Sequence, residues 1–274
     1  MSHLEHNRRA WDTLVSRQER HTLAARDEDF ADPLATINAD GWLGEGVTGK
    51  RVLCLAAGGG RHSALYAAAG GVVTVVDLSP AMLALDRAVA AERNLPIRIV
   101  ETSMDNLRMF ATGEFDLVVQ PVSTCYVPDI LAVYRQVAWV LRPDGVYISQ
   151  HKSPVSLQCA VEPNAQGRYE LREPYYRAGP LPDVTGSPHR EGGTLEYLHR
   201  WQELIGGLCQ AGFVIEDCRE PPHARASAAA GVFGHRSQFV APYIRLKARR
   251  VTAGNSSTFN GKNKDSSVNL WLPE

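Results

Sequence analysis

The chain has 274 residues, of which 44% are hydrophobic, and it carries 29 Lys and Arg residues against 30 Asp and Glu residues. That length fits one large α/β domain or two small ones and can bury a full hydrophobic core. The near-neutral charge argues against a protein that binds duplex nucleic acid, because such proteins carry an excess of Lys and Arg. No apolar run approaches the roughly 20 residues that a helix needs to cross a bilayer, and the N-terminal residues lead into no secretory signal. We therefore expect a globular protein with neither a nucleic-acid nor a membrane partner.

The cysteines are odd in number, and no two of them are spaced as C-x-x-C. A disulfide framework or a zinc cluster is therefore not expected, and we predict that the chain resides in the cytoplasm, where thiols stay reduced. The five cysteines are Cys54, Cys125, Cys159, Cys209 and Cys218.

The two ends of the chain differ from its middle. Residues 4–25 have the pattern of an exposed amphipathic helix, and we assign residues 1–44 to an N-terminal helical cap. Residues 251–274 are rich in Ser, Asn, Thr, Gly and Lys, which predicts a disordered tail or sequence foreign to the domain. The main domain is expected over residues 45–250.

Apolar runs alternate with helical patterns in the first half of this domain. The strands are continuous apolar runs, as expected of parallel strands that are covered on both faces. Ser79 with Pro80, and Asp129, are placed to begin two of the helices. This alternation predicts a doubly wound, Rossmann-like α/β fold in which helices cover both faces of a mostly parallel sheet. Strands are expected at 52–56, 72–77, 97–100, 115–119 and 146–149, and helices at 61–69, 79–93 and 129–140.

A further helix and two strands complete a sheet of seven strands. The helix is predicted over residues 194–211 and ends at Gly212, and the strands are predicted over 213–216 and 239–246. Because proline cannot donate a hydrogen bond to a neighbouring strand, Pro242 predicts an edge position or a bulge in the last strand.

An insertion separates the fifth strand from that helix. Residues 152–193 contain six prolines, and an irregular segment of this length more often forms a lid or a substrate wall than a passive connector. Within it, residues 156–161 and 168–172 are predicted to pair as a hairpin.

The most informative segment is a glycine turn at the end of the first strand, Cys54-Leu-Ala-Ala-Gly-Gly-Gly60. Glycines at this junction let the backbone approach a ligand closely, and the helix that follows offers free N–H groups. A tight turn without a ligand would also use glycines, but the second strand ends in Asp77, an acid placed to accept hydrogen bonds from a ribose diol. The turn lacks the third glycine of G-x-G-x-x-G, and the chain has no P-loop.

Five motifs follow one another across roughly residues 45–150: Val52-Leu-Cys-Leu-Ala-Ala-Gly-Gly-Gly60, Val75-Val-Asp-Leu-Ser-Pro-Ala-Met-Leu83, Ser103-Met-Asp-Asn-Leu107, Phe115-Asp-Leu-Val-Val119 and Leu141-Arg-Pro-Asp-Gly145. In their order and spacing they resemble the motifs of class I S-adenosylmethionine-dependent methyltransferases, and residues 194–249 match that family's ending. The resemblance implies S-adenosylmethionine as cofactor, S-adenosylhomocysteine as product and methyl transfer by in-line displacement.

The resemblance assigns eight positions to the cofactor. Ala56, Gly58 and Gly60 would lie against its methionine part. Asp77 would bind the ribose hydroxyls, and Leu78 would pack beside the adenine.

The other three positions lie further along the chain. Met104 and Asp105 would sit at the adenine, with Asp105 accepting a hydrogen bond from the exocyclic amine, and Gln120 would border both cofactor and substrate. Cys54 stands where the family usually has an acid, and Ala56 where it has its first glycine. The amino group of the cofactor would therefore need another partner.

The candidates for catalysis follow the fourth and fifth strands, since ligands of open α/β sheets bind at the carboxyl ends of the strands. His151 is the first candidate for a general base because imidazole titrates near neutral pH, although it could instead shape the pocket. Tyr126 could orient or deprotonate the acceptor, or form a pocket wall. We expect Lys152 to be a solvated charge or an anion anchor, and Cys125 to be a small buried residue.

The insertion and the following helix supply the predicted substrate wall. Arg172, Tyr175 and Tyr176 would line it, with the arginine able to clamp a carboxylate or phosphate; a solvated hairpin is the alternative. Glu196 and His199 are three residues apart and would share one helix face toward the cleft. The nearby His and Glu residues lack the spacing of a metal motif, so no metal site is expected.

We therefore predict a methyltransferase that acts on a small, polar metabolite, and the oligomeric state stays open. An RNA or protein methyltransferase is disfavoured because Gln120-Pro-Val-Ser is not the Asn/Asp-Pro-Pro-aromatic motif of enzymes that methylate planar nitrogens. A non-catalytic S-adenosylmethionine-binding module, suggested by Cys54 and Ala56, and an NAD-dependent oxidoreductase remain as alternatives.

Overall fold

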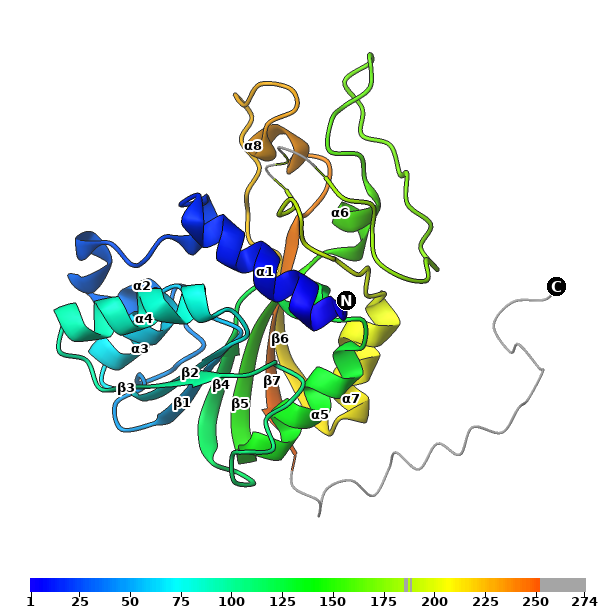
Figure 1. The fold of residues 1–274 in the computed structure, drawn as a ribbon. Coiled ribbons are helices and arrows are strands. Elements are labelled where there is room, and N and C mark those ends of the chain that lie inside the picture. The colour runs from blue at the N-terminus through cyan, green and yellow to red at the C-terminus, as the bar shows by residue number, and fades with distance from the viewer. Residues whose placement is uncertain (185–186, 188, 252–274) are drawn as a thin grey trace, which may run out of the picture.

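The computed structural model describes residues 1–184, 187 and 189–251. They form a seven-stranded sheet in the order β3-β2-β1-β4-β5-β7-β6 (Figure 1). β1 to β5 are parallel, and β7 runs antiparallel to both β5 and β6. The predicted α/β sheet is confirmed, whereas the predicted tail, apart from Val251, lies outside the described residues. The strands are β1 (Arg51–Leu55), β2 (Val72–Asp77), β3 (Ile97–Glu101), β4 (Phe115–Gln120), β5 (Leu141–Lys152), β6 (Phe213–Arg219) and β7 (Tyr243–Arg250).

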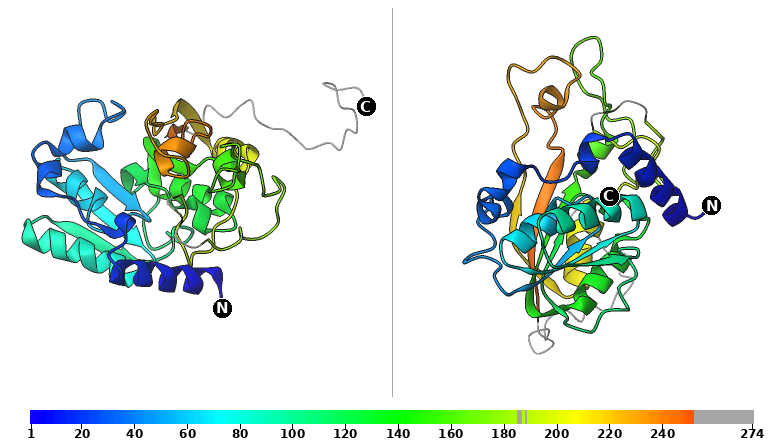
Figure 2. Two further views of the ribbon diagram at one scale, coloured as in Figure 1. Left: turned by 90° about the horizontal axis from the view of Figure 1, so that it is seen from above. Right: turned by 60° about the vertical axis from the view of Figure 1, so that its left-hand side comes forward.

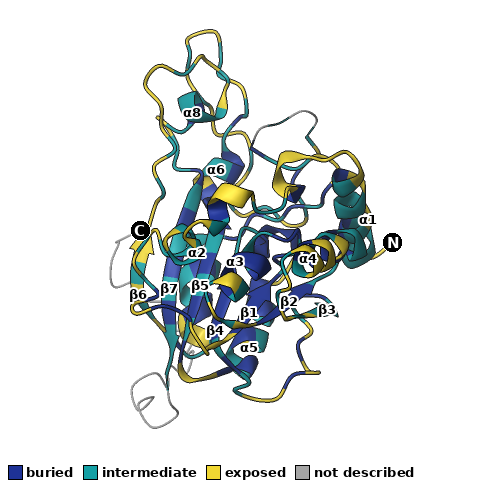
Figure 3. Ribbon diagram, turned by 90° about the vertical axis from the view of Figure 1, so that its left-hand side faces the viewer, coloured by how far each residue is buried: buried dark blue, intermediate teal, exposed yellow. Residues whose placement is uncertain are grey.

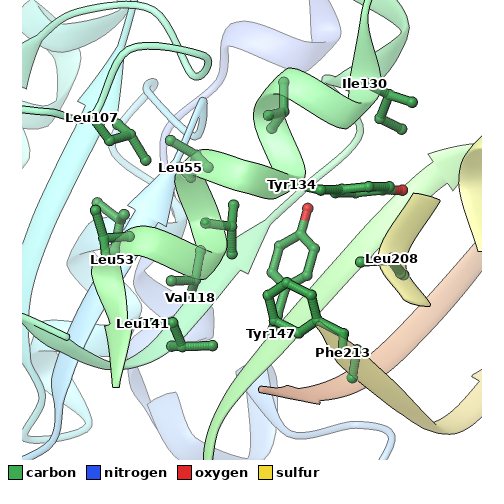
Figure 4. Close-up of a cluster of buried hydrophobic side chains, with 14 of the residues drawn as sticks. Leu53, Leu55, Leu107, Val118, Ile130, Tyr134, Leu141, Tyr147, Leu208 and Phe213 are labelled. Carbon is green, nitrogen blue, oxygen red and sulfur yellow. The ribbon is translucent and has the colours of Figure 1, made fainter. Parts of the chain in front are cut away.

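Helices cover both faces of the sheet, which explains the continuous apolar strands. In β1, Leu53 and Leu55 belong to the core that includes α5 and α7 (Figure 4). Val52 and Cys54 belong to a second core with side chains of α3 and α4. Successive strand residues point to opposite faces, so β1 is buried from Val52 onward (Figure 3). The covering helices are α3 (His62–Ala68), α4 (Pro80–Glu92), α5 (Ile130–Val140) and α7 (Gly207–Gln210).

Two helices begin at the residues that the sequence indicated. The Ser79 hydroxyl accepts a hydrogen bond from the N–H of Met82 at 3.1 Å, at the start of α4. The Asp129 carboxylate accepts from the N–H groups of Leu131 and Ala132 at 2.9 and 3.2 Å, at the start of α5. Among the helices that the structure describes, none is both long and apolar enough to cross a bilayer.

The N-terminal helix is shorter than predicted. α1 (His3–Ser16) ends before Gln18, which has a φ of +53°. α1 packs against α4 beside the carboxyl ends of the strands (Figures 1 and 2). Oδ1 of Asp12 accepts a hydrogen bond from the Ser79 hydroxyl at 2.6 Å, so α1 is tied to the start of α4. The short elements that follow are η1 (Arg20–Thr22), η2 (Asp27–Phe30) and α2 (Pro33–Ile37).

The helix predicted over residues 194–211 forms only in its second half. Residues 194–200 are not helical. The carbonyl oxygen of Glu196 accepts instead a hydrogen bond from the N–H of Leu181 at 2.7 Å, so a tertiary contact takes an acceptor that the predicted helix would pair with the N–H of Arg200. The helical part begins near the π-helix η4 (Gln202–Gly206), which leads into α7.

The prediction made for Pro242 beyond the fifth strand is wrong. Pro242 precedes β7, and β7 lies inside the sheet rather than at its edge. The carbonyl oxygen of Pro242 accepts a hydrogen bond from the N–H of Ser153 at 2.9 Å. The predicted hairpin is confirmed in part. Residues 156–158 belong to the helix α6 (Pro154–Gln158), but an antiparallel bridge pairs Cys159 with Leu171, and the N–H of Ala160 donates to the carbonyl oxygen of Glu170 at 2.8 Å.

Candidate active site

A cavity of about 1150 Å³ opens at the carboxyl ends of β1, β2 and β4. Ligands of open α/β sheets bind at this edge, and single ligand sites measure about 300–1000 Å³, so the cavity has room for more than one small molecule. Its walls come from the glycine turn, from α1 and from residues 220–242, which we call the arch. The arch contains α8 (Phe233–Arg236) and projects beyond the sheet (Figures 1 and 2).

The glycine turn brings backbone atoms to the cavity. Ala56 lines it with a φ of +45°, a conformation that favours glycine. Gly58 also lines it, and a Cβ added there would lie 2.8 Å from Cβ of Met82. Gly60 does not line the cavity. It packs against α4, where an added Cβ would lie 3.0 Å from a backbone oxygen. The predicted contact of Gly60 with a ligand is thus replaced by close packing against a helix.

The carboxylate of Asp77 lines the cavity beside this turn. Its Oδ2 accepts a hydrogen bond from the N–H of Gly58 and its Oδ1 from the N–H of Ser79, both at 2.9 Å. Burial raises the pKa of Asp77 to about 6, and these two hydrogen bonds limit the rise. A carboxylate oxygen can accept more than one hydrogen bond, so both oxygens remain able to receive a ligand's hydroxyl groups.

Asp86 of α4 supports the turn and was missed in the sequence analysis. It is fully buried, its Oδ2 accepts a hydrogen bond from the N–H of Gly59 at 2.9 Å, and the hydroxyl of Ser63 donates to its Oδ1. Burial raises the pKa of Asp86. The signal was available, because Asp86 stands four residues after Met82 and three before Val89, among the buried positions of the helix.

Three of the remaining predicted cofactor residues, Leu78, Met104 and Gln120, line the cavity. Gln120 is held in place because its Oε1 accepts a hydrogen bond from the Tyr147 hydroxyl at 2.5 Å. Asp105 does not line the cavity, and its carboxylate accepts a hydrogen bond from a neighbouring serine hydroxyl. This geometry does not support the predicted contact between Asp105 and an adenine.

His151 is placed where it cannot act as the predicted general base. Its side chain is buried behind the cavity wall, with Nδ1 2.8 Å from the Thr124 hydroxyl and Nε2 2.8 Å from the Ser149 hydroxyl. Burial, with a smaller contribution from His199, lowers the pKa of His151 to about 3. Both ring nitrogens are therefore engaged within the protein, and the ring contributes to packing behind the site.

Tyr126 lines the cavity, and its position is closely defined. Its hydroxyl donates to Oε2 of Glu191 at 2.7 Å, and its ring meets that of Trp11 edge-on at 5.5 Å between centroids. Nδ2 of Asn7 donates to its carbonyl oxygen at 2.9 Å. Burial raises the pKa of Tyr126 far above its usual value, so the phenol stays protonated and is suited to orienting a ligand rather than deprotonating it.

Lys152 belongs to a buried ion cluster, which contradicts the predicted solvated charge. Its Nζ lies 2.6 Å from Oε2 of Glu191 and also pairs with Glu196, which in turn pairs with Arg190. Burial opposes the ionisation of Glu191, but the charge of Lys152 outweighs it and lowers the pKa of Glu191 to about 2. Oε1 of Glu191 lies 3.5 Å from Nε2 of His21 at the cavity wall. Among the described residues, no group of three or more His, Cys, Asp and Glu side chains could hold a metal ion.

Five residues were predicted to contact the substrate and to have no other role. None of them lines the cavity: Arg172, Tyr175, Tyr176, Glu196 and His199. Tyr176 is 79% exposed, because the loop that carries it projects away from the sheet. Among the described residues of the insertion 152–193, Glu191 alone reaches the cavity, so the predicted lid is not confirmed.

The arch supplies the wall instead. His223 and Arg225 line the cavity. The buried side chain of Arg236 anchors the arch, since its guanidinium donates to the carbonyl oxygens of Ser156 at 2.6 Å and Ala160 at 2.9 Å. The arch has no motif or periodic pattern, and an arginine buried in this way carries no recognisable signal in a single sequence.

Comparisons with known proteins agree with this geometry. Residues 53–149 match the model of a family described as "Methyltransferase domain". The chain is 32% identical over 224 residues to an uncharacterised methyltransferase, YbaJ, of Bacillus subtilis, a match that covers 77% of this chain and 87% of that protein. It is 35% identical over 105 residues to a ubiquinone biosynthesis O-methyltransferase of Haemophilus ducreyi, covering 37% of this chain and 44% of that protein.

A solved structure shares the fold. The crystal structure of an S-adenosylmethionine-dependent methyltransferase from Mesorhizobium loti matches with a TM-score of 0.64 at 24% identity, covering 81% of this chain and 100% of that one. The order of the strands, the glycine turn with Asp77 and the relative matched over most of its length all indicate one family. The chain belongs to the class I S-adenosylmethionine-dependent methyltransferases, and S-adenosylmethionine is its cofactor.

Proposed function

We propose that this methyltransferase transfers the methyl group of its cofactor to a small-molecule acceptor bound between Tyr126, Glu191 and the arch. The observation that carries the proposal is the lining of the cavity: besides the cofactor turn and Gln120 it includes residues of α1 and of the arch, to which we assign the acceptor side. Such a compartment is suited to a metabolite rather than to a flat macromolecular surface.

The residues of the turn fit the cofactor. The absence of a Cβ at Gly58 lets the turn pack closely against Met82 and Asp77, and the carboxylate of Asp77 remains able to accept hydrogen bonds from a ribose diol. Bound there, S-adenosylmethionine supplies a methyl group that is already activated by its sulfonium. The task of the protein is then to hold the acceptor in line with that methyl group. Gln120, fixed by Tyr147, borders the point where cofactor and acceptor would meet.

On the acceptor side, Tyr126 and Glu191 are polar groups that line the cavity and that hydrogen bonds hold in place. The Tyr126 hydroxyl donates to Glu191 and keeps its own lone pairs for a hydrogen bond from the acceptor. Oε1 of Glu191, beside His21, is oriented toward the cavity. We assign orientation of the acceptor to Tyr126 and leave no catalytic role to His151.

We also propose a cytoplasmic location and a metabolite rather than an RNA or protein substrate. All five cysteines are free thiols, as is usual in a reducing compartment. The 29 basic and 30 acidic residues leave no excess positive charge for a nucleic-acid partner.

The test is a comparison of acceptor fractions. The full chain is incubated with S-adenosylmethionine and with the low-mass, RNA or protein fraction of a cell extract, and formation of S-adenosylhomocysteine is measured. We expect turnover with the low-mass fraction and none for Asp77→Ala. Methyl transfer confined to RNA or protein would contradict the proposal, and binding of the cofactor without turnover in any fraction would favour a non-catalytic binding module.

The elevated pKa of Asp77 predicts that cofactor binding depends on pH. Below about pH 6 the carboxyl takes up a proton and loses acceptor capacity for the ribose hydroxyls. We expect the affinity for S-adenosylhomocysteine to fall by about tenfold between pH 7 and pH 5, as measured by calorimetric titration. The folding stability of the apoprotein depends on pH in the opposite direction. Because the pKa of Asp77 is raised in the folded state, this group stabilises the apoprotein most at low pH, and that contribution is lost as pH rises through 6. Asp77→Asn should abolish this pH dependence, and its persistence in the variant would assign it to another group.

A further inference from the structure

His223 in the arch carries a buried nitrogen that has no protein partner. Its ring packs edge-on against those of Phe233 and Tyr243, with centroids 5.3 and 5.5 Å apart. Nε2 is buried, and no hydrogen-bonding group of the described residues reaches it. Because a buried polar atom without a partner is unfavourable, such an atom indicates a place where a ligand or a water supplies the partner. The His223 ring lines the cavity, so a ligand there contacts the imidazole even though Nε2 itself is buried.

Three arginine residues line the cavity together with this imidazole. Arg20 of η1, Arg225 of the arch and Arg245 of β7 all line the same cavity. Burial lowers the pKa of His223, and the positive charges of Arg245, Arg20 and Arg225 lower it further. The guanidinium of Arg245 is held by Asp40 at 2.8 Å. Within the described part of the chain, those of Arg20 and Arg225 form no ion pair and no side-chain hydrogen bond.

The acidic groups on this side of the cavity do not balance these two charges. Asp40 is paired with Arg245, and Glu191 is paired with Lys152 and also receives the Tyr126 hydroxyl. The remaining carboxylate of the lining, Asp77, lies at the cofactor turn. The acceptor side therefore carries the uncompensated positive charges of Arg20 and Arg225, in the lining that also includes His223.

We propose that Arg20, His223 and Arg225 form a subsite for a carboxylate or phosphate group of the methyl acceptor, an inference that rests on the proposed function. A guanidinium presents planar donors that match both anions, and the imidazole can donate a third hydrogen bond in the appropriate tautomer. Phe233 and Tyr243 also line the cavity. Their rings can pack against an apolar or flat part of the acceptor. The substrate class is thus a small anion with an apolar portion.

The test uses simple probes on the full chain saturated with S-adenosylhomocysteine. Phenyl phosphate and benzoate represent the two anions, benzyl alcohol is the neutral analogue, and binding is measured by calorimetric titration. We expect at least one anion to bind more tightly than the alcohol, which also distinguishes phosphate from carboxylate. Arg20→Gln and Arg225→Gln should each weaken that binding by about tenfold, and the double variant by about a hundredfold.

Arg172→Gln is the matched control, because Arg172 is an exposed arginine that does not line the cavity. It should leave anion binding unchanged. A neutral analogue that binds as tightly as the anions, an absence of binding by both anions, or anion binding that survives in the double variant would each overturn the subsite. Since binding of S-adenosylhomocysteine is measured first, failure of the subsite is distinguishable from failure of the cofactor site.

A second readout needs no ligand. The pKa of His223, followed by NMR of its ring protons with His223→Gln for assignment, should rise when Arg20 and Arg225 are both replaced by glutamine, because two positive charges near the ring are removed. Arg172→Gln should not change it. An unchanged pKa in the double variant would show that the arginines do not face the imidazole.

Discussion

Replacing Asp77 with alanine is expected to weaken the binding of S-adenosylhomocysteine by about a hundredfold. At about 1.5 kcal/mol for each hydrogen bond between a ribose hydroxyl and the carboxylate, the lower end of the range for charged groups, two of them correspond to a factor of about one hundred in affinity. The substitution also removes the acceptor for the N–H groups of Gly58 and Ser79, which loosens the turn itself. Calorimetric titration of both proteins at pH 7.5 or above, where the carboxyl is ionised, measures the effect.

Asp105→Ala is the matched control, since it removes the same kind of side chain from a position that sequence analysis assigned to the adenine. Asp105 does not line the cavity, so we expect a change of no more than about twofold. Thermal unfolding of both variants separates a lost contact from a lost fold. Equal losses of affinity in the two variants would contradict the geometry of the site.

Replacing Lys152 with methionine is expected to lower the free energy of unfolding by about 3–5 kcal/mol, the usual consequence of stranding a buried charge. Lys152 is 6% exposed and Glu196 is fully buried. Without the ammonium group, Glu196 keeps Arg190 as its partner, and Glu191 keeps His21 and the Tyr126 hydroxyl. Urea unfolding followed by circular dichroism measures the change, provided that the slope is unaltered.

Lys247→Met is the control for this experiment. Lys247 pairs with Glu216 at 3.1 Å on a partly exposed part of β7, and loss of such a pair costs no more than about 1 kcal/mol. Adding Glu196→Gln to Lys152→Met removes one stranded charge and should recover part of the stability, which also gives a measurable protein if the single variant does not fold. A loss for Lys152→Met no larger than that for Lys247→Met would contradict a buried ion cluster.

The parallel part of the sheet could be predicted because its signals are local. Each apolar run is long enough for a strand, and residues such as Ser79 and Asp129 mark helix starts through bonds that span three residues or fewer. The segment 194–200 could not be predicted in this way. Its apolar pattern fits a helix, but the N–H of Tyr197 donates to the carbonyl oxygen of Cys125, a partner that no local pattern reveals.

In the candidate site, too, the parts that depend on local signals could be predicted and the parts that depend on long-range contacts could not. The cofactor side depends on a turn and on the strand end that carries Asp77, and both are visible in the sequence. The acceptor side depends on contacts between distant segments, so His151, which follows a strand in the expected place, is buried behind the wall. The side chains that do line this part, His223 and Arg225, lie in a segment without any pattern.

The hydrogen bonds of Asn7 impose an order on the maturation of the chain during synthesis. This residue bonds to Tyr126 and Leu195, which are 119 and 188 positions later in the chain. At a translation rate of about 5–20 residues per second, Leu195 follows Asn7 by on the order of ten to forty seconds. α1 therefore leaves the ribosome first and docks among the last elements. During that interval β1 to β5 are already available to pair. The half of the molecule that holds the cofactor is therefore assembled before α1 completes the wall on the acceptor side of the cavity.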